Sequence, residues 1–240
     1  MERPKGIRSI SGRFFRMNLP GVFVCHKGSL AFYCKIGYNI KKIFAEICSI
    51  SYEQDGVIFY IDTLRTDEIA IEKKYPGVRL TLTASLDTIR QYVSMDIGFG
   101  DVITPSPSEL DYPNLLDGFP NTDIMAYSLE TVVAEKFQTM ISRAETNSRM
   151  KDFYDLYTIL QGGKYNAEIL DEAIKATFKN RQTNYMENHV AFSLAFAKNS
   201  NLNIRWNAFM KKLKIPTQLT FFEVMDYLQV KLKPYWENLK

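Results

Sequence analysis

The sequence contains few residues that form disulfides or bind transition metals. Its only cysteines are Cys25, Cys34 and Cys48, and its only histidines are His26 and His189. The cysteines are odd in number and have no paired spacing, which argues against a disulfide framework and favours a reducing compartment. The two histidines lie far apart in the chain, so neither a zinc site nor a Cys/His nucleophile is expected.

Long apolar runs are also absent. No run approaches the roughly 20 apolar residues of a membrane-spanning helix, and the first residues lack the apolar core of a signal peptide. We therefore expect a soluble, cytoplasmic protein. Charge is nearly balanced, with 30 Lys and Arg against 27 Asp and Glu. This mild positive excess permits a nucleic-acid partner but does not argue for one.

The spacing of apolar residues changes near residue 125. Before it, β-rich runs and two apolar helical stretches predict a small mixed sheet with flanking helices. After it, apolar residues recur at helical spacing almost to the end. We expect an α+β fold with a core in residues 1–125 and a helical C-terminal half in residues 126–240. The predicted strands are Gly21–Cys25, Val57–Ile61, Arg79–Ala84 and Gln91–Gly98, and the predicted helices are Leu30–Ile36, Ile40–Ile50, Ser128–Arg143, Ala167–Lys179, Ile204–Leu213 and Phe221–Leu232. The proline-rich stretch from 101 to 123 is predicted to be a long connecting loop.

Two neighbouring helices carry an unusual density of charge beside their apolar stripes. Ser128 is a plausible N-cap of the first helix, and Gly162-Gly163 ends the second. If the two helices are antiparallel, they bring Lys136 towards Arg149, Lys151 and Asp152. Asp152 and Asp155 are three residues apart, and Lys151 and Asp155 are four apart, so each pair can share a face. A surface set of weak ion pairs is the simplest interpretation, and a reactive site is the alternative.

Several segments then favour the reactive site, because together they resemble the nucleotidyltransferase-like AbiEii/AbiGii toxin family. That family has a Tyr-x-x-Glu-x-x-x-Ala-Glu-Lys helix followed by an Arg-x-Lys-Asp-x-x-Asp-Leu helix, as in residues 127–136 and 149–156 here. Similar segments of the middle region and the helical tail are Tyr75–Leu80, Met95–Asp101, Tyr112–Leu116, Ala173–Thr183 and Trp206–Phe209. The resemblance covers nearly the whole chain from about Phe23, with the motifs in the same order.

The resemblance implies both a fold and an activity. The fold is a nucleotidyltransferase core of the DNA polymerase beta-like kind, whose cleft is completed by the helical half. The activity is transfer of a nucleoside monophosphate from an NTP to RNA, with tRNA one candidate, or to a protein acceptor. It implies a divalent metal ion, Mg²⁺ or Mn²⁺, and a cognate antitoxin as partner. The alternative is a catalytically degenerate member that binds RNA or protein. A kinase-like phosphotransferase is disfavoured, because no His-Arg-Asp motif or Gly-rich phosphate loop is present.

Under the catalytic hypothesis, individual residues receive roles. Lys136 faces the triphosphate as a compact cation, and Asp152 acts as general base or as a further acid at the metal. Arg149 and Lys151 hold phosphate or RNA backbone. The remaining predicted site residues are Gly28 and Ser29 as a phosphate cradle, Asp96 as a metal ligand, Asp155 as a partner of Lys151 or of a neighbouring helix, and Glu130 and Glu135 as supports for the cations.

Two of these assignments have simpler alternatives. The Gly28-Ser29 pair is also what an ordinary turn before a helix contains, and Asp96 is also consistent with an aspartate on an edge strand that faces water. The catalytic hypothesis requires that both sites, together with Lys136 and Asp152, open onto one cleft.

One departure from the family pattern matters. The family places an Arg-x-Thr-x-Asp-x-Asp segment shortly after the Gly-Gly helix, but this sequence contains no Asp-x-Asp anywhere. An omitted segment, a genuine deletion and a degenerate, non-catalytic member are the three explanations. Simple loss of a central strand is costly, because its neighbours would lose ladder hydrogen bonds. If the sequence is complete, a two-metal mechanism is hard to sustain with Asp96 alone.

Overall fold

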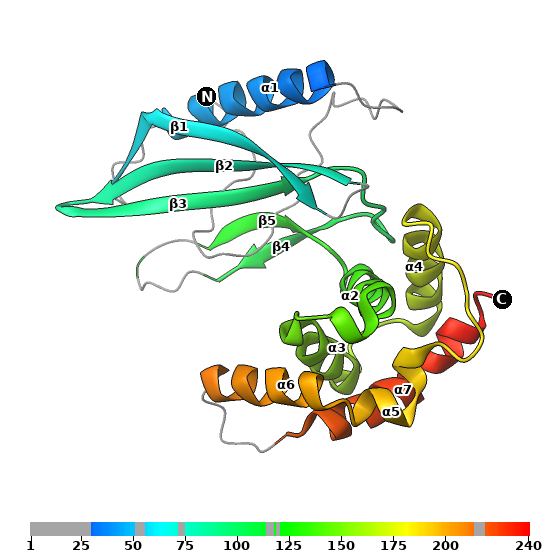
Figure 1. Ribbon diagram of the computed structural model, residues 1–240. Helices are drawn as coiled ribbons and strands as arrows, with labels where there is room; N and C mark the ends of the chain where they lie inside the picture. The colour runs from blue at the N-terminus through cyan, green and yellow to red at the C-terminus, as the bar shows by residue number, and fades with distance from the viewer. Residues whose placement is uncertain (1–29, 51–55, 72–74, 114–117, 119–120, 214–218) are drawn as a thin grey trace. The chain divides into compact units, whose positions relative to one another are not determined.

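The described residues form two compact units that divide between Asp101 and Val102, and each unit is considered by itself. The computed structural model (Figure 1) describes residues 30–50, 56–71, 75–113, 118, 121–213 and 219–240. Helices and antiparallel strands both contribute, so the predicted α+β class is confirmed. The predicted strand Gly21–Cys25 and the Gly28-Ser29 turn lie outside the described residues. No helix in the described part is long and apolar enough to cross a membrane.

The first unit contains one helix and a three-stranded antiparallel sheet in the order β1-β2-β3. Its elements are α1 (Leu30–Cys48), β1 (Val57–Ile71), β2 (Tyr75–Leu86) and β3 (Ile89–Gly98). All three predicted strands that fall here are present. The two predicted helices are one continuous helix, so the predicted break between them is wrong. A glycine such as Gly37 weakens a helix interior by about 1 kcal/mol but does not end it.

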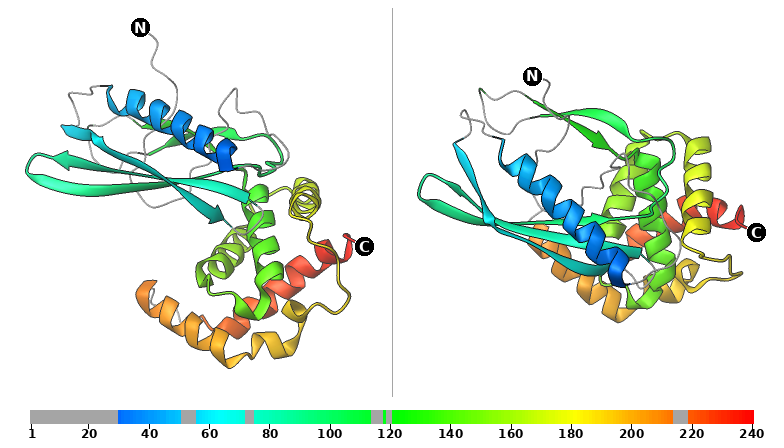
Figure 2. Two further views of the ribbon diagram at one scale, coloured as in Figure 1. Left: turned by 45° about the horizontal axis from the view of Figure 1, so that its top comes forward. Right: turned by 90° about the horizontal axis from the view of Figure 1, so that it is seen from above.

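Helix α1 lies along one face of this sheet (Figure 2). Ile40 and Phe44 are four residues apart on α1, and they are buried against Leu64, Leu80 and Leu82 of the strands. Alternate residues of β2 point to the same side of the sheet, which explains why Leu80 and Leu82 enter the same apolar cluster. The cluster holds α1 on the sheet.

The second unit begins with a hairpin that sequence patterning does not reveal. Strands β4 (Ser108–Tyr112) and β5 (Thr122–Ala126) pair antiparallel inside the stretch predicted to be a connecting loop. The prediction of a loop is therefore wrong for these residues. Both strands have only five residues, and β4 is mostly exposed, so the strand signal in the sequence is weak.

Helices make up the rest of the second unit, as predicted from residue 128 onward. They are α2 (Leu129–Arg143), α3 (Met150–Gly162), α4 (Ala167–Asn180), α5 (Leu194–Ala197), α6 (Ser200–Leu213) and α7 (Phe221–Glu237), with 3-10 turns at Ala144–Thr146 and Val190–Phe192. Ser128 caps α2 by accepting a hydrogen bond from the N–H of Thr131, and Gly163 ends α3 in the left-handed conformation with a φ of 62°. Both predicted helix boundaries are confirmed.

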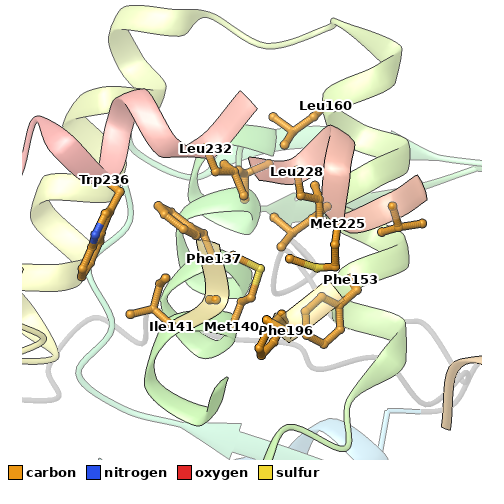
Figure 3. Packing of buried hydrophobic residues seen from close by; sticks show 14 of the residues in the cluster. Phe137, Met140, Ile141, Phe153, Leu160, Phe196, Met225, Leu228, Leu232 and Trp236 are labelled. Atoms are coloured by element: carbon orange, nitrogen blue, oxygen red, sulfur yellow. The ribbon is translucent and has the colours of Figure 1, made fainter. Parts of the chain in front are cut away.

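The core of the second unit is rich in aromatic rings (Figure 3). Phe137 of α2 packs against Phe178 of α4 with ring centroids 5.2 Å apart. Phe153 of α3 packs edge-on against Phe221 of α7 at the same distance. Each fully buried ring contributes on the order of 2–3 kcal/mol through removal from water. The core therefore fixes α2 and α3, which carry the predicted reactive residues.

Candidate active site

Helices α2 and α3 bring one lysine and two aspartates together. The Lys136 Nζ lies 2.7 Å from Asp152 Oδ1 and 2.8 Å from Asp155 Oδ2. The three side chains are only 15–20% exposed. Asp152 and Asp155 are three residues apart on α3, so they project from one face towards α2. The predicted approach of Lys136 to Asp152 is found, and Asp155 joins the same cluster.

Lys151 extends this cluster towards solvent. Its amine also binds Asp155, four residues further along α3, and its side chain is largely exposed. Asp155 thus bridges a partly buried lysine and an exposed one, which corresponds to the supporting position predicted for it. The cluster holds two cations and two anions, so it carries no net charge.

Lys136 is a stable cation at neutral pH. Burial by itself lowers its pKa, but the hydrogen bonds and negative charges of Asp152 and Asp155 outweigh burial, so its pKa lies above the ordinary lysine value. A protonated lysine cannot accept a proton. Lys136 is therefore suited to bind negative charge, and Asp152 is the group of this pair with a lone pair to accept a proton.

The start of α3 is fixed by a residue that sequence reasoning missed. Asn147 is fully buried, and its Oδ1 accepts a hydrogen bond of 2.8 Å from the N–H of Arg149. Its backbone carbonyl accepts a hydrogen bond from Arg205 of α6. Asn147 stands just before the helix, a position where asparagine side chains often bond the backbone. Arg149 is itself exposed at the N-terminus of α3, which leaves its guanidinium available to an anion.

The two predicted supporting glutamates have other partners. Glu130 accepts a hydrogen bond of 2.8 Å from the N–H of Asn166 and so fixes the start of α4. Glu135 lies 3.6 Å from the Arg181 guanidinium. Both contacts hold α2 to the chain around α4, and Glu130 does not bind Lys136, Arg149 or Lys151. The sequence shows no local signal for these contacts, because they join segments distant in the chain.

Asp96 lies in the first unit, in a pair with a residue that sequence reasoning also missed. The Arg79 guanidinium binds it through two hydrogen bonds of 2.6 and 2.7 Å. Arg79 on β2 and Asp96 on β3 are opposite each other in the strand register. The arginine occupies one lone pair on each carboxylate oxygen of Asp96. Lys136 and Asp152 belong to the second unit, so the cleft predicted to unite all three stays a prediction.

The described carboxylates do not form a metal site by themselves. No group of three His, Cys, Asp or Glu side chains with suitable geometry occurs within the described part of the chain. Asp96, Asp152 and Asp155 each already bind a cationic side chain. A divalent ion needs several oxygen ligands, and these residues do not supply such a set.

The match to a protein-family model agrees with the sequence motifs. The JHP933 protein of Helicobacter pylori is similar in structure, with a TM-score of 0.39 and 15% identity over 90% of this chain and 74% of that chain. A candidate nucleotidyltransferase from H. pylori gives a TM-score of 0.38 and 14% identity over 77% of this chain and 69% of that one. No curated protein matches the sequence. The family described as nucleotidyl transferase AbiEii toxin, type IV TA system, matches residues 33–230. The chain therefore belongs to the AbiEii nucleotidyltransferase toxin family.

Proposed function

We propose that this protein is a toxin that transfers a nucleoside monophosphate from an NTP to an RNA acceptor, tRNA among the candidates, or to a protein acceptor. Family membership supports the reaction class. The observation that carries the assignment to this site is the contact between the Lys136 ammonium and the Asp152 carboxylate. It places a fixed positive charge beside a proton acceptor, and the reaction needs both.

The proposed chemistry is a displacement at the α-phosphorus of the NTP. An acceptor hydroxyl oxygen bonds to that phosphorus, the bond from phosphorus to the bridging oxygen breaks, and pyrophosphate leaves. The acceptor proton moves to Asp152. Lys136 binds the phosphate charge that builds up in the transition state, while Asp155 holds the lysine in place.

Arg149, Lys151 and the N-terminal residues have binding roles in this proposal. Arg149 and Lys151 are exposed near the start of α3, where they can bind further phosphates of the nucleotide or the acceptor. Gly28 and Ser29 cradle the triphosphate. The core of residues 1–125 binds the nucleotide, and the helical domain of residues 126–240 supplies Lys136 and Asp152.

A divalent ion, Mg²⁺ or Mn²⁺, is part of the proposal only as a companion of the nucleotide. Nucleotide phosphates commonly provide ligands for Mg²⁺ together with one or two carboxylates. Asp96 is the carboxylate assigned to it, through the lone pairs that Arg79 leaves free. No step of the proposed chemistry is assigned to the ion, because the described side chains do not form a site for it.

Two further elements follow from the family. A type IV toxin acts within a toxin–antitoxin system, so we propose a cognate antitoxin as partner, a role in abortive infection and a place in the cytoplasm. A different function, RNA or protein binding without catalysis, is favoured by two observations. The sequence has no Asp-x-Asp, and Asp96, Asp152 and Asp155 each bind a cationic side chain.

Transfer of labelled nucleotide separates the two functions. The purified protein is incubated with each α-labelled NTP, Mg²⁺ and total tRNA, alongside the variants Lys136→Ala and Asp152→Asn. Transfer by the unmodified protein is expected, with a loss of about 100-fold or more in each variant. Lys212→Ala, an exposed lysine in the last turn of α6, is the matched control and should retain activity.

Undiminished transfer by both variants would remove Lys136 and Asp152 from the mechanism. Absence of transfer, combined with RNA binding that does not depend on Mg²⁺, would establish the non-catalytic function instead. Circular dichroism of each variant checks that it remains folded.

A further inference from the structure

Two adjoining recesses lie between α4, the chain that follows it, and the end of α7. The first has a volume of about 320 Å³, and the second about 210 Å³. Tyr185 and Lys240 line both recesses, so the two form one continuous surface. Figures 1 and 2 show α4 beside the C-terminal end of α7. A hydrogen bond of 3.1 Å from Asn238 to Asp171 ties these two helices together.

The larger recess is cationic. Lys175, Lys179 and Lys240 line it together with polar side chains, and the described residues of its lining include no aspartate or glutamate. Lys175 and Lys179 are four residues apart on α4, so both amines project from one face. Lys175 also contacts Asp171, which stands outside the lining. Exposed lysines with neighbouring amide donors are the groups that bind phosphates of a nucleic-acid backbone.

The smaller recess has an aromatic wall, and the charged side chains Glu187, Lys233 and Glu237 also line it. Tyr185 and His189 pack around Trp236 with ring centroids 5.2 and 5.6 Å away. Trp236 is anchored by a hydrogen bond from its Nε1 to the carbonyl of Met186. The Lys240 amine lies 5.5 Å from the centroid of the Tyr185 ring. A nucleic-acid base can stack on the tyrosine ring in the place of this flexible lysine. The lysine amine can then move from the ring to a phosphate.

The wall of the larger recess is attached to helix α2 of the candidate active site. Gln138 is buried, donates a hydrogen bond of 2.8 Å to Thr183 and accepts one of 2.7 Å from Arg181. Residues 136 and 138 differ by about 200° around a helix. The recess therefore lies on another side of α2 from Lys136, and a ligand in it leaves the Lys136 cluster free.

We propose that these two recesses together bind a single-stranded segment of RNA, with its phosphates on Lys175, Lys179 and Lys240 and a base against Tyr185. The inference rests on the proposed function in one respect, because it names RNA as the acceptor and gives its docking surface. A single strand fits better than a duplex, since only unpaired bases can reach a ring inside a recess.

Fluorescence anisotropy with a labelled single-stranded RNA of about 12 nucleotides, bound to the full chain over a range of salt concentrations, tests the phosphate contacts. The variant Lys175→Ala/Lys179→Ala removes two of them. The slope of log affinity against log salt should fall by about 1.4, which corresponds to about 25-fold weaker binding at 0.1 M salt if affinities converge at 1 M. Lys211→Ala/Lys212→Ala on α6 removes the same charge elsewhere and should change neither value appreciably.

A second pair of variants tests the ring. Tyr185→Ala should weaken binding about tenfold, in line with the contribution of one stacked base, while Tyr185→Phe keeps the ring and should bind normally. The inference is overturned if the α4 lysine variant binds like the unmodified protein, if the α6 variant loses as much, or if a duplex of the same sequence binds as tightly as the single strand.

The nucleotide-transfer assay keeps this inference separate from the proposed function. If RNA binds at Lys175 and Lys179 but no nucleotide is transferred, the proposed function fails and the docking surface stands. If nucleotide is transferred to RNA equally well by the α4 lysine variant, with unchanged KM for RNA, the docking surface fails and the proposed function stands.

Discussion

The Lys136 ammonium lies 2.7 Å from the Asp152 carboxylate, although 16 residues separate them in the chain. The two helices that carry them are held by the aromatic core, so the contact does not depend on flexible loops. Removal of the lysine alone would leave two partly buried carboxylates without their main cation. An unpaired buried charge destabilises the fold by more than the intact ion pair stabilises it.

Lys136→Met should therefore lower the free energy of unfolding by about 1–3 kcal/mol. Urea denaturation followed by tryptophan fluorescence measures it. The double variant Lys136→Met/Asp152→Asn should be less destabilised than the sum of the two single variants, because each partner's removal relieves the other's cost. Additive losses would show that the pair is too solvated to matter for stability.

The ion pair of Asp96 distinguishes a structural role from a metal-binding role. Arg79 is about half exposed, so Asp96→Asn and Arg79→Gln should each change stability only slightly, because exposed ion pairs contribute little. If Asp96 binds a metal ion during catalysis, Asp96→Asn should abolish nucleotide transfer while Arg79→Gln leaves transfer measurable. Equal effects of the two substitutions on nucleotide transfer would show that Asp96 has only a structural role in the sheet.

The features predicted correctly from sequence are those set by local chemistry. Neighbouring residues determine that Ser128 is an N-cap, that Gly163 ends a helix and that α2 has an apolar stripe. The helix pair and the approach of Lys136 to Asp152 could therefore be predicted from the sequence. The pairing of Arg79 with Asp96 could not, because it depends on the register of two strands. Register is fixed by the turn and by burial across the sheet, which no single segment displays.

The same distinction explains the other differences. The hairpin of β4 and β5 depends on cross-strand pairing between two strands of only five residues each. The contact of Glu130 with Asn166, 36 residues away, arises only when α2 and α4 pack together. Contacts of this kind form only when the fold brings distant segments together. The family motifs show which residues are present, but they do not show which residue each one contacts.

Asn147 should be the residue of this region most sensitive to substitution. Asn147→Ala removes the acceptor of the hydrogen bond from the Arg149 N–H at the start of α3, which should cost about 1–2 kcal/mol. Asn201→Ala, at an exposed position of α6, should change stability by less than about 0.5 kcal/mol. Thermal unfolding of both variants compares the two costs, and similar values would contradict a special role for Asn147.

Stability should also depend on pH through His189. Burial lowers the pKa of this imidazole below its ordinary value, and its Nδ1 accepts a hydrogen bond of 3.3 Å from the N–H of Ala191. Protonation would destroy that acceptor. Because the folded pKa lies below the unfolded value of about 6.5, the unfolded chain takes up the proton first as pH falls. The free energy of unfolding should therefore be constant above about pH 7 and decrease towards pH 5.

Comparison with His189→Gln isolates this contribution, because glutamine does not titrate and the other acidic groups remain the same. Urea denaturation at several pH values should give curves that converge as pH falls, with the unmodified protein losing more stability. Trp236 lies 5.6 Å from the imidazole, so its fluorescence reports both unfolding and local protonation. A difference between the two proteins that stays constant from pH 7.5 to 5 would mean that His189 does not titrate differently in the folded and unfolded states.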